Sequence, residues 1–350
     1  MQRCLVLAHH GRGHVAPNPM VGAVLVRNDQ VLAEGWHGRF GGPHAEVECL
    51  RAFGEERVPE DAVLYVNLEP CSHHGKTPPC SDLVIARGVS RVVIGQRDPF
   101  PEVAGKGIAA LRAAGVQVEE EGLEGACRWL QRRFNTLHER KRPHVVLKWA
   151  RTMDGFIDHG PRAGRGVQRI TGPAADTLVH RWRSEEMAIM VGARTVIADD
   201  PSLTTRLVAG PSPIRVVLDR NNSIPLDSRV LDGSVRTLLF TGAERTIGTV
   251  EEVRIAADEE ALPQVLAALA ERRIHSVLVE GGAELLGHFI RQGLWDEARV
   301  LTGRAHAGRG TPAPVLAADR AGLWTIGGDR LEIFDAPGVL RPAHVRALET

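Results

Sequence analysis

The fold and chemistry of this chain are best inferred from Pro43-His44-Ala45-Glu46 and from Glu69-Pro70-Cys71, which Pro79-Cys80 follows. One histidine and two cysteines can hold a zinc ion with three protein ligands, which leaves a fourth position open for water. Such an open position is typical of a catalytic zinc rather than a structural one. We therefore predict one zinc ion per chain, bound by three side chains: His44, Cys71 and Cys80.

Glu46 lies close to His44 in the sequence but is not needed as a ligand, so it is free to move protons. A His-x-Glu motif with a later cysteine pair is the signature of zinc deaminases that act on bases. Zinc lowers the pKa of bound water to about 7. A carboxylate that is not a ligand can take the proton of that water and return protons to the ring and the leaving ammonia. We predict that Glu46 is this general acid and base.

A closed structural zinc knuckle is the alternative, since His73 and His74 lie between the two cysteines and either could be a fourth ligand. Each cysteine is preceded by proline, which is typical of a loop that presents thiolates at the start of a helix. This favours the open, catalytic site.

Composition limits the class of protein. The length of 350 residues predicts two domains. Lys plus Arg and Asp plus Glu are equal at 43 each, so no basic excess attracts nucleic acid. No apolar run approaches the roughly 20 residues that span a bilayer, and no signal peptide is recognised. Three cysteines remain beside the two ligands, an odd number that argues against disulfides and for a reducing cytoplasm.

The hydrophobic pattern divides near residue 142. In the first part we expect helices and strands to alternate in a mixed sheet covered by helices. The predicted strands are Val21–Val26, Val31–Trp36, Ala62–Leu68, Val92–Gly95 and Val116–Glu119. The predicted helices are residues 3–10, Ala45–Phe53, Ser81–Arg87, Ile108–Ala114 and a charged helix from Glu124 to about Arg140. That last helix is interpreted as a solvated face joining two domains, with a phosphate-binding patch as the alternative.

The pattern restarts at His144. The predicted strands are Val145–Trp149, Met187–Val191, Ile214–Leu218, Thr237–Thr241, Val277–Val279 and Ala298–Leu301. The predicted helices are Pro173–Arg183 with Thr171 as its N-cap, Glu259–Arg272 and Ala283–Gln292. The turn at Gly281-Gly282 would let the backbone approach a phosphate at a helix start. No G-x-G-x-x-G follows the first strand of this part, so a Rossmann domain is not indicated.

Longer motifs resemble one family over nearly the whole chain. In the first half they are Pro17-Asn18-Pro19-Met20-Val21-Gly22-Ala23, His44-Ala45-Glu46, and the stretch from Leu68 to Cys80 with its eight-residue spacing between cysteines. In the second half they are Lys148–Gly155, Thr195–Thr204, Arg206 and Glu280-Gly281-Gly282. The chain resembles the RibD family of bifunctional riboflavin-biosynthesis enzymes, in which a pyrimidine deaminase is fused to a reductase.

The resemblance implies an α/β protein with two domains. Residues 1–142 would form a cytidine-deaminase-like three-layer α/β/α domain, and residues 143–350 a dihydrofolate-reductase-like α/β domain. The first would bind Zn²⁺ and deaminate 2,5-diamino-6-ribosylamino-4(3H)-pyrimidinone 5′-phosphate. The second would use NADPH to reduce the ribosyl group to ribityl. A cytoplasmic homodimer or higher oligomer, formed through the reductase domain, is expected.

The resemblance also implies site residues. Four side chains would bind the deaminase substrate, the last two holding its phosphate: Asn18, His37, Lys76 and Thr77. Six would bind the cofactor: Arg151, Arg169, Thr195, Asp199, Gly281 and Gly282. Four would bind the reductase substrate: Arg183, Leu203, Arg206 and Glu280.

The chain departs from the family pattern at several places. Arg169 stands where many relatives have Trp, and Arg220 where others have Ser. Phe100 replaces a common Asn, and Leu301-Thr302-Gly303-Arg304 replaces a usual Ala-Pro-Lys turn. Two other functions remain open: a deaminase with a degenerate, dimerising second domain, and a deaminase that edits nucleic acid, which the neutral charge disfavours.

Overall fold

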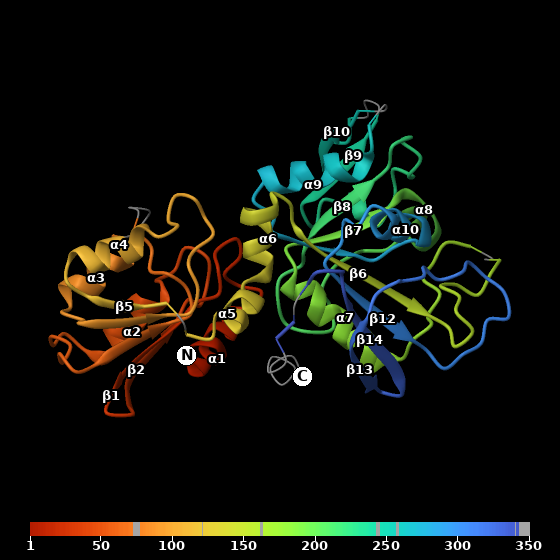
Figure 1. Cartoon of the computed structure of the whole chain (residues 1–350). Coiled ribbons are helices and arrows are strands. Elements are labelled where there is room, and N and C mark those ends of the chain that lie inside the picture. Colours follow the sequence, from red (N-terminus) through yellow and green to blue (C-terminus); the bar gives the residue numbers. More distant parts are fainter. Residues whose placement is uncertain are drawn as a thin grey trace. The chain divides into compact units, whose positions relative to one another are not determined.

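The computed structural model describes residues 1–72, 78–120, 122–161, 164–242, 246–256, 259–339 and 341–342. The chain forms two compact units, shown in Figure 1. The first comprises Met1–Lys141 and residues from Arg341 onward, and the second comprises Arg142–Leu340.

The first unit is built on a five-stranded sheet with the order β2-β1-β3-β4-β5. Its strands are β1 (Gly22–Arg27), β2 (Gln30–Trp36), β3 (Val63–Val66), β4 (Arg91–Ile94) and β5 (Gln117–Glu119). β1 is antiparallel to β2 and β3, whereas β3, β4 and β5 run parallel. Asn28 and Asp29 turn the β1–β2 hairpin with φ of 50° and 60°, as tight hairpins require. The strands predicted at Val21–Val26 and Val31–Trp36 are confirmed.

Helices cover both faces of this sheet. They are α1 (Gln2–His9), α2 (Ala45–Phe53), α3 (Cys80–Ala86), α4 (Lys106–Ala113), α5 (Glu124–Leu130) and α6 (Arg132–Arg140). Val24 of β1 packs with Cys4 and Leu7 of α1. Its neighbour Leu25 belongs to the core that includes Leu50 of α2. Successive side chains of a strand point to opposite faces, so β1 lies between two helical layers.

The predicted single helix from Glu124 to Arg140 is wrong, because Gln131 separates α5 from α6. The prediction that its charged face is solvated holds for Glu139, Arg140 and Lys141 but is wrong for Arg132 and Arg133, which are buried. The Arg132 guanidinium lies 4.5 Å from the centroid of the Trp129 ring, and its Nη1 donates to the Trp129 carbonyl at 3.1 Å. The aromatic face and the carbonyl of Trp129 stabilise this cation in its buried position. Arg341 also lies over the Trp129 ring, at 4.3 Å.

The second unit has a nine-stranded sheet with the order β10-β9-β8-β7-β11-β6-β12-β14-β13. Its strands are β6 (His144–Arg151), β7 (Ala188–Gly192), β8 (Ile214–Leu218), β9 (Thr237–Thr241), β10 (Glu251–Arg254), β11 (Ser276–Val279), β12 (Glu297–Thr302), β13 (Arg320–Ile326) and β14 (Asp329–Asp335). The strands from β10 to β12 are parallel, and β14 and β13 add an antiparallel edge.

Helices cover both faces of this sheet as well (Figure 1). They are α7 (Pro173–Glu185), α8 (Ala193–Asp199), α9 (Ala261–Glu271) and α10 (Ala283–Arg291), with a short 3₁₀ helix η1 (Arg229–Leu231). Leu147 of β6 belongs to the core containing Phe289 of α10. Val146 belongs to the core containing Trp182 of α7. The predicted N-cap at Thr171 is wrong, since Gly172 occupies that position, but Pro173 is in the first turn as expected.

Among the described residues, no helix is both long enough and apolar enough to cross a membrane.

Candidate functional site

The three predicted zinc ligands come together in the first unit. His44 is the N-cap of α2 and Cys80 is the first residue of α3, while Cys71 follows β3. Their ligand atoms all lie within 4.8 Å of one another. The His44 Nδ1 atom is 3.3 Å from Cys80 Sγ and 3.6 Å from Cys71 Sγ. In the described part of the chain this is the one group of three such side chains placed to hold a metal.

The donor set fits zinc. One imidazole nitrogen and two sulfurs are ligands that zinc prefers, and three protein ligands leave one position open. The hydrogen bond from the Cys80 thiol lowers the pKa of the Cys71 thiol to about 4, against the effect of burial, and His44 adds to the lowering. The cluster therefore favours a thiolate at Cys71. His73 and His74, the ligands of the alternative closed site, lie outside the described residues.

Glu46 lies in the first turn of α2 and its side chain is only 3% exposed. Burial raises the pKa of its carboxyl to about 7, and the charge of Cys71 acts in the same direction. A carboxyl whose pKa is near the working pH can both accept and return a proton. Glu46 is not part of the ligand group, so its oxygens are available for that transfer.

Two predicted substrate-binding residues form a wall beside the ligands. The Asn18 Nδ2 amide is 3.1 Å from His37 Nε2, and His37 Nδ1 is 2.8 Å from the Pro43 carbonyl. Because a carbonyl can only accept, Nδ1 of His37 carries the proton and Nε2 accepts from Asn18. The His37 and His44 rings stack edge to face at 5.4 Å. Lys76 and Thr77, predicted to hold the phosphate, lie outside the described residues.

The second unit contains a cavity of about 1130 Å³ at the carboxyl ends of β6, β7, β8 and β11. This edge is where parallel α/β sheets place their ligands. Nine predicted site residues line it: Arg169, Arg183, Thr195, Asp199, Leu203, Arg206, Glu280, Gly281 and Gly282. Arg151 is not among the lining residues. Its guanidinium donates instead to Thr302 Oγ1 at 3.0 Å and to Glu332 at 2.8 Å.

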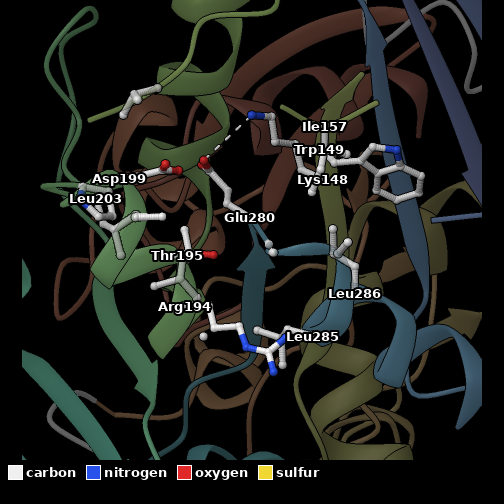
Figure 2. Close-up of a pocket in the computed structure, with 18 of the residues that line it drawn as sticks. Lys148, Trp149, Ile157, Arg194, Thr195, Asp199, Leu203, Glu280, Leu285 and Leu286 are labelled. Carbon is white, nitrogen blue, oxygen red and sulfur yellow. Dashed lines mark ion pairs between the residues drawn. The ribbon is translucent and has the colours of Figure 1, made fainter. Parts of the chain in front are cut away.

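An ionic cluster forms one wall of this cavity. Arg183 donates to both carboxylate oxygens of Glu280, at 2.7 and 2.8 Å, and Lys148 Nζ lies 3.8 Å from the same carboxylate. Figure 2 shows Lys148 and Glu280 facing each other, with Thr195 and Asp199 on the neighbouring helix. Burial would raise the pKa of Glu280, but the charges of Arg183 and Lys148 outweigh it and hold the pKa at about 2. Glu280 is therefore ionised.

Backbone groups of the segment after α8 form hydrogen bonds with side chains of α7. The Arg206 N–H donates to His180 Nδ1 at 2.9 Å, and the Thr204 carbonyl accepts from Arg183 at 3.2 Å. Leu203, which precedes Thr204 in this segment, is 2% exposed and has a φ of 51°. Burial, together with the charges of Arg183 and Arg206, lowers the pKa of His180 to about 4, which keeps its ring neutral.

The glycine turn predicted to face the cofactor is closely packed. Gly281 has a φ of 113°, a conformation that other residues rarely adopt. A side chain at Gly282 would begin 3.3 Å from Thr195 Oγ1, a tight contact that requires the neighbouring side chain to shift. The turn leads directly into α10, and the first residues of that helix line the cavity.

Some lining residues were not predicted. Lys148 and His180 both face the cluster around Glu280, although neither was singled out in the sequence. Lys148 lies in a quoted motif, and a lysine at the end of a buried strand was an available signal. His180 had none, because its partner Arg206 meets it only through the tertiary fold. Two positions at which the chain departs from the family pattern also line the cavity: Arg169 and Arg220. Arg169 forms an ion pair with Asp176.

Comparison with known proteins gives matches in both halves. The family model of the cytidine and deoxycytidylate deaminase zinc-binding region matches residues 1–96, and that of the RibD C-terminal domain matches residues 143–315. Riboflavin biosynthesis protein RibD of Actinobacillus pleuropneumoniae is 37% identical over 346 residues, covering 96% of this chain and 88% of that protein. The protein of the same name from Escherichia coli is 36% identical over 356 residues, covering 96% and 93%.

A solved structure agrees over nearly the whole length. It is a diaminohydroxyphosphoribosylaminopyrimidine deaminase/5-amino-6-(5-phosphoribosylamino)uracil reductase from Thermotoga maritima, 36% identical with a TM-score of 0.86. The match covers 96% of this chain and 97% of that one.

Proposed function

This chain belongs to the RibD family of riboflavin-biosynthesis enzymes, and from that premise we propose which of its residues carry out the two reactions. It is a bifunctional enzyme that acts on a small phosphorylated pyrimidine. The deaminase activity requires zinc, and the reductase activity requires NADPH. The first step removes an amino group from 2,5-diamino-6-ribosylamino-4(3H)-pyrimidinone 5′-phosphate. The second reduces the ribosyl chain and gives 5-amino-6-(5-phosphoribitylamino)uracil.

In the deaminase half, His44, Cys71 and Cys80 hold the metal, which when bound makes a nucleophile available from water at neutral pH. Glu46 would take one proton from that water and pass it to a ring nitrogen. It would then take the second proton from the hydroxyl formed on the ring carbon and pass it to the departing amine, which leaves as ammonia. Its burial supports this role, because the pKa of about 7 lets it work in both directions. Asn18 and His37 orient the pyrimidine, and Lys76 and Thr77 hold its phosphate.

In the reductase half, NADPH supplies a hydride. Gly281 and Gly282 would hold its phosphates, because the glycine backbone lets them come close, and Thr195 and Asp199 line the same cavity. We assign Arg151 and Arg169 to the cofactor as well. Since the guanidinium of Arg151 is engaged by Thr302 and Glu332, this role requires it to exchange those partners.

The reductase substrate lies against the opposite group of residues. Arg183 gives most of its donors to Glu280 and Thr204, so we infer that it orients these groups more than it binds phosphate. Arg206 keeps its guanidinium directed to one hydroxyl, of Thr204, at 2.8 Å. It is therefore the stronger ligand for the phosphate. Leu203 packs against the ribosyl chain, and Glu280 is placed to hydrogen-bond its hydroxyls.

We assign deamination to residues 1–142 and reduction to residues 143–350. We also propose that the enzyme works in the cytoplasm and assembles as a homodimer or higher oligomer through its reductase domain. The cytoplasmic assignment is supported by five cysteines that form no disulfide with one another. Sedimentation velocity of the whole chain and of the isolated second unit tests the assembly, and a monomeric second unit would refute the assigned interface.

The observation that carries the proposal is that each half contains a separate set of groups: a His–Cys–Cys cluster with a buried carboxyl, and a cavity with a glycine turn and an ionic wall. The test is to supply the diaminopyrimidine substrate with and without NADPH. Without NADPH the ribosylated aminouracil should accumulate, and with NADPH the ribityl product should replace it. Deamination with no NADPH oxidation would instead favour a degenerate second domain.

A further inference from the structure

Glu69 is a buried carboxylate just before Cys71 to which neither half-reaction assigns a role. Its side chain is 3% exposed, and its own backbone N–H donates to the Gln96 carbonyl at 3.0 Å. A charged group is rarely buried so completely unless it is paired or fully hydrogen-bonded. No cation contacts Glu69 in the described residues, so its partners must be sought among backbone groups.

Four backbone N–H groups satisfy this carboxylate. Asp98 and Gly105 donate to Oε2 at 3.2 and 3.0 Å. Gly107 and Ile108 donate to Oε1 at 2.9 and 3.2 Å. Each oxygen thus accepts two hydrogen bonds. An ionised carboxylate can do this because both of its oxygens act only as acceptors.

These contacts make Glu69 the missing cap of α4. The N-cap residue of that helix is Gly105, which has no side chain, and the helix has no acidic residue in its first turn. The first N–H groups of a helix need acceptors, and its N-terminus favours a negative charge. Glu69 supplies both from a distant segment of the chain.

The N-terminal end of α4 is also in close contact with the backbone that leads to Cys71. A side chain at Gly107 would begin 2.0 Å from the Pro70 carbonyl oxygen, so only glycine permits this approach. Pro70 is the residue between Glu69 and Cys71. Any shift of the α4 end toward or away from the sheet is therefore passed to Cys71.

Cys71 is held from the other side by α3. The Ser81 N–H donates to the Cys71 carbonyl at 3.1 Å, and the Cys80 N–H lies 3.3 Å from Cys71 Sγ. The ligand segment is thus fixed between the starts of two helices. One is bound through Cys71 itself, and the other through Glu69.

We propose that Glu69 is a positioning residue of the metal centre: by capping α4 it sets the position of Cys71 Sγ relative to His44 and Cys80. The inference rests on the proposed zinc site. It predicts that loss of the Glu69 carboxylate weakens metal binding even though Glu69 never touches the metal.

The test compares Glu69→Gln with the wild type in the full-length protein. Glutamine has nearly the same shape, but its NH₂ group would face two N–H donors that now meet an oxygen. Zinc release to a colorimetric chelator should be about tenfold faster, in the lower part of the range for groups outside the ligand shell. In the cobalt-substituted protein, the thiolate-to-metal absorption bands should shift. NADPH-dependent reduction of pre-deaminated substrate should be unchanged.

Leu111→Val is the matched control. Leu111 is a buried residue of α4 in the hydrophobic core of the first unit, and it belongs to neither the ligand group nor the cap of the helix. This variant should lower the thermal stability of the first unit while leaving zinc release and the cobalt spectrum as in the wild type. If Glu69→Gln behaves like Leu111→Val, Glu69 only stabilises the helix and the inference is overturned.

Gly107→Ala provides a second, independent perturbation and decides the matter if Glu69→Gln does not fold. It keeps the carboxylate but forces the α4 end away from Pro70, and it should also shift the cobalt bands. An unchanged cobalt spectrum in Gly107→Ala would overturn the inference. Wild-type protein that binds no stoichiometric zinc would instead refute the metal site itself, which separates failure of the proposed function from failure of the role of Glu69.

Discussion

Arg183 and Glu280 form a two-pronged ion pair inside the cavity of the second unit, with Nε to Oε1 at 2.7 Å and Nη2 to Oε2 at 2.8 Å. They are 97 residues apart in the sequence, and both side chains are about nine-tenths buried. Such planar, paired hydrogen bonds fix orientation as well as charge. The pair therefore joins α7 to the turn that follows β11.

Arg183→Leu should destabilise the second unit strongly, because it leaves Glu280 buried with only Lys148 nearby. Removing one partner of a buried pair typically costs about 3–5 kcal/mol. Urea unfolding followed by tryptophan fluorescence measures the loss. The double variant Arg183→Leu/Glu280→Leu should recover much of it, since no buried charge is left unpaired. A single variant as stable as the wild type would contradict the importance of the pair.

The stability of the second unit should fall as the pH drops from about 6.5 toward 4, because of His180. The pKa of this ring is lowered to about 4 in the folded protein, chiefly by burial, against an ordinary value near 6.5. The unfolded chain therefore binds the proton more readily within this window, and acid favours unfolding. Protonation would also break the hydrogen bond that Nδ1 accepts from Arg206. Thermal unfolding of His180→Gln at several pH values should show a weaker dependence than the wild type.

Cys71→Ser should lose most of the zinc, since a neutral hydroxyl is a far poorer ligand than a thiolate. Elemental analysis of wild-type protein should give about one zinc per chain, and the variant much less. Cys49→Ser is a suitable control, because Cys49 is buried in the core of the same unit and is not in the ligand group. Full zinc content in Cys71→Ser would refute the assignment.

Glu46→Gln should keep zinc and lose deamination by at least about 10²–10⁴-fold, because only proton transfer is removed. The measurement is the rate of ammonia release together with metal content. Reduction of pre-deaminated substrate should persist at the wild-type rate. Loss of both activities together would show that the two halves do not act as separate sites.

Gly282→Val should abolish NADPH binding and leave deamination intact. The first atom of the new side chain would lie 3.3 Å from Thr195 Oγ1, and the branched remainder would fill the place assigned to the pyrophosphate. Fluorescence titration with NADPH measures the affinity. Gly293→Ala is the control at another glycine of the second unit. The added Cβ would meet no atom within 4 Å, and the φ of 63° makes the substitution a test of backbone strain alone. Unchanged affinity in Gly282→Val would place the cofactor elsewhere.

The grouping of His44, Cys71 and Cys80 could be predicted from the sequence because they occupy short motifs whose residue types indicate the chemistry. The grouping of Lys148, His180 and Arg206 could not, since these residues meet only after the sheet has formed. Burial of Arg132 was predicted wrongly for a similar reason. A basic side chain in a charged stretch is predicted to be solvated unless the structure shows what covers it. Here the ring of Trp129 covers Arg132.

The second sheet was predicted only in part. Its six central strands are apolar runs that a parallel sheet buries on both faces, and each was recognised. The two edge strands β10 and β13 were missed, as was β14 beside β13. All three have mixed polarity, and β13 alternates between exposed and half-buried positions. The Gly327-Gly328 pair that turns this hairpin, with φ of 58° and 97°, was the available signal.

Arg341 packs on Trp129, so the last described residues belong with the unit in which the chain begins. The reductase unit is therefore an insertion, in the topological sense, into a deaminase unit that the chain leaves at Lys141 and re-enters at Arg341. A single proteolytic cut after Lys141 would therefore leave Arg341 on the reductase fragment and Trp129, on which it packs, on the other. Independent expression of the two activities thus calls for breaks on both sides of the insertion.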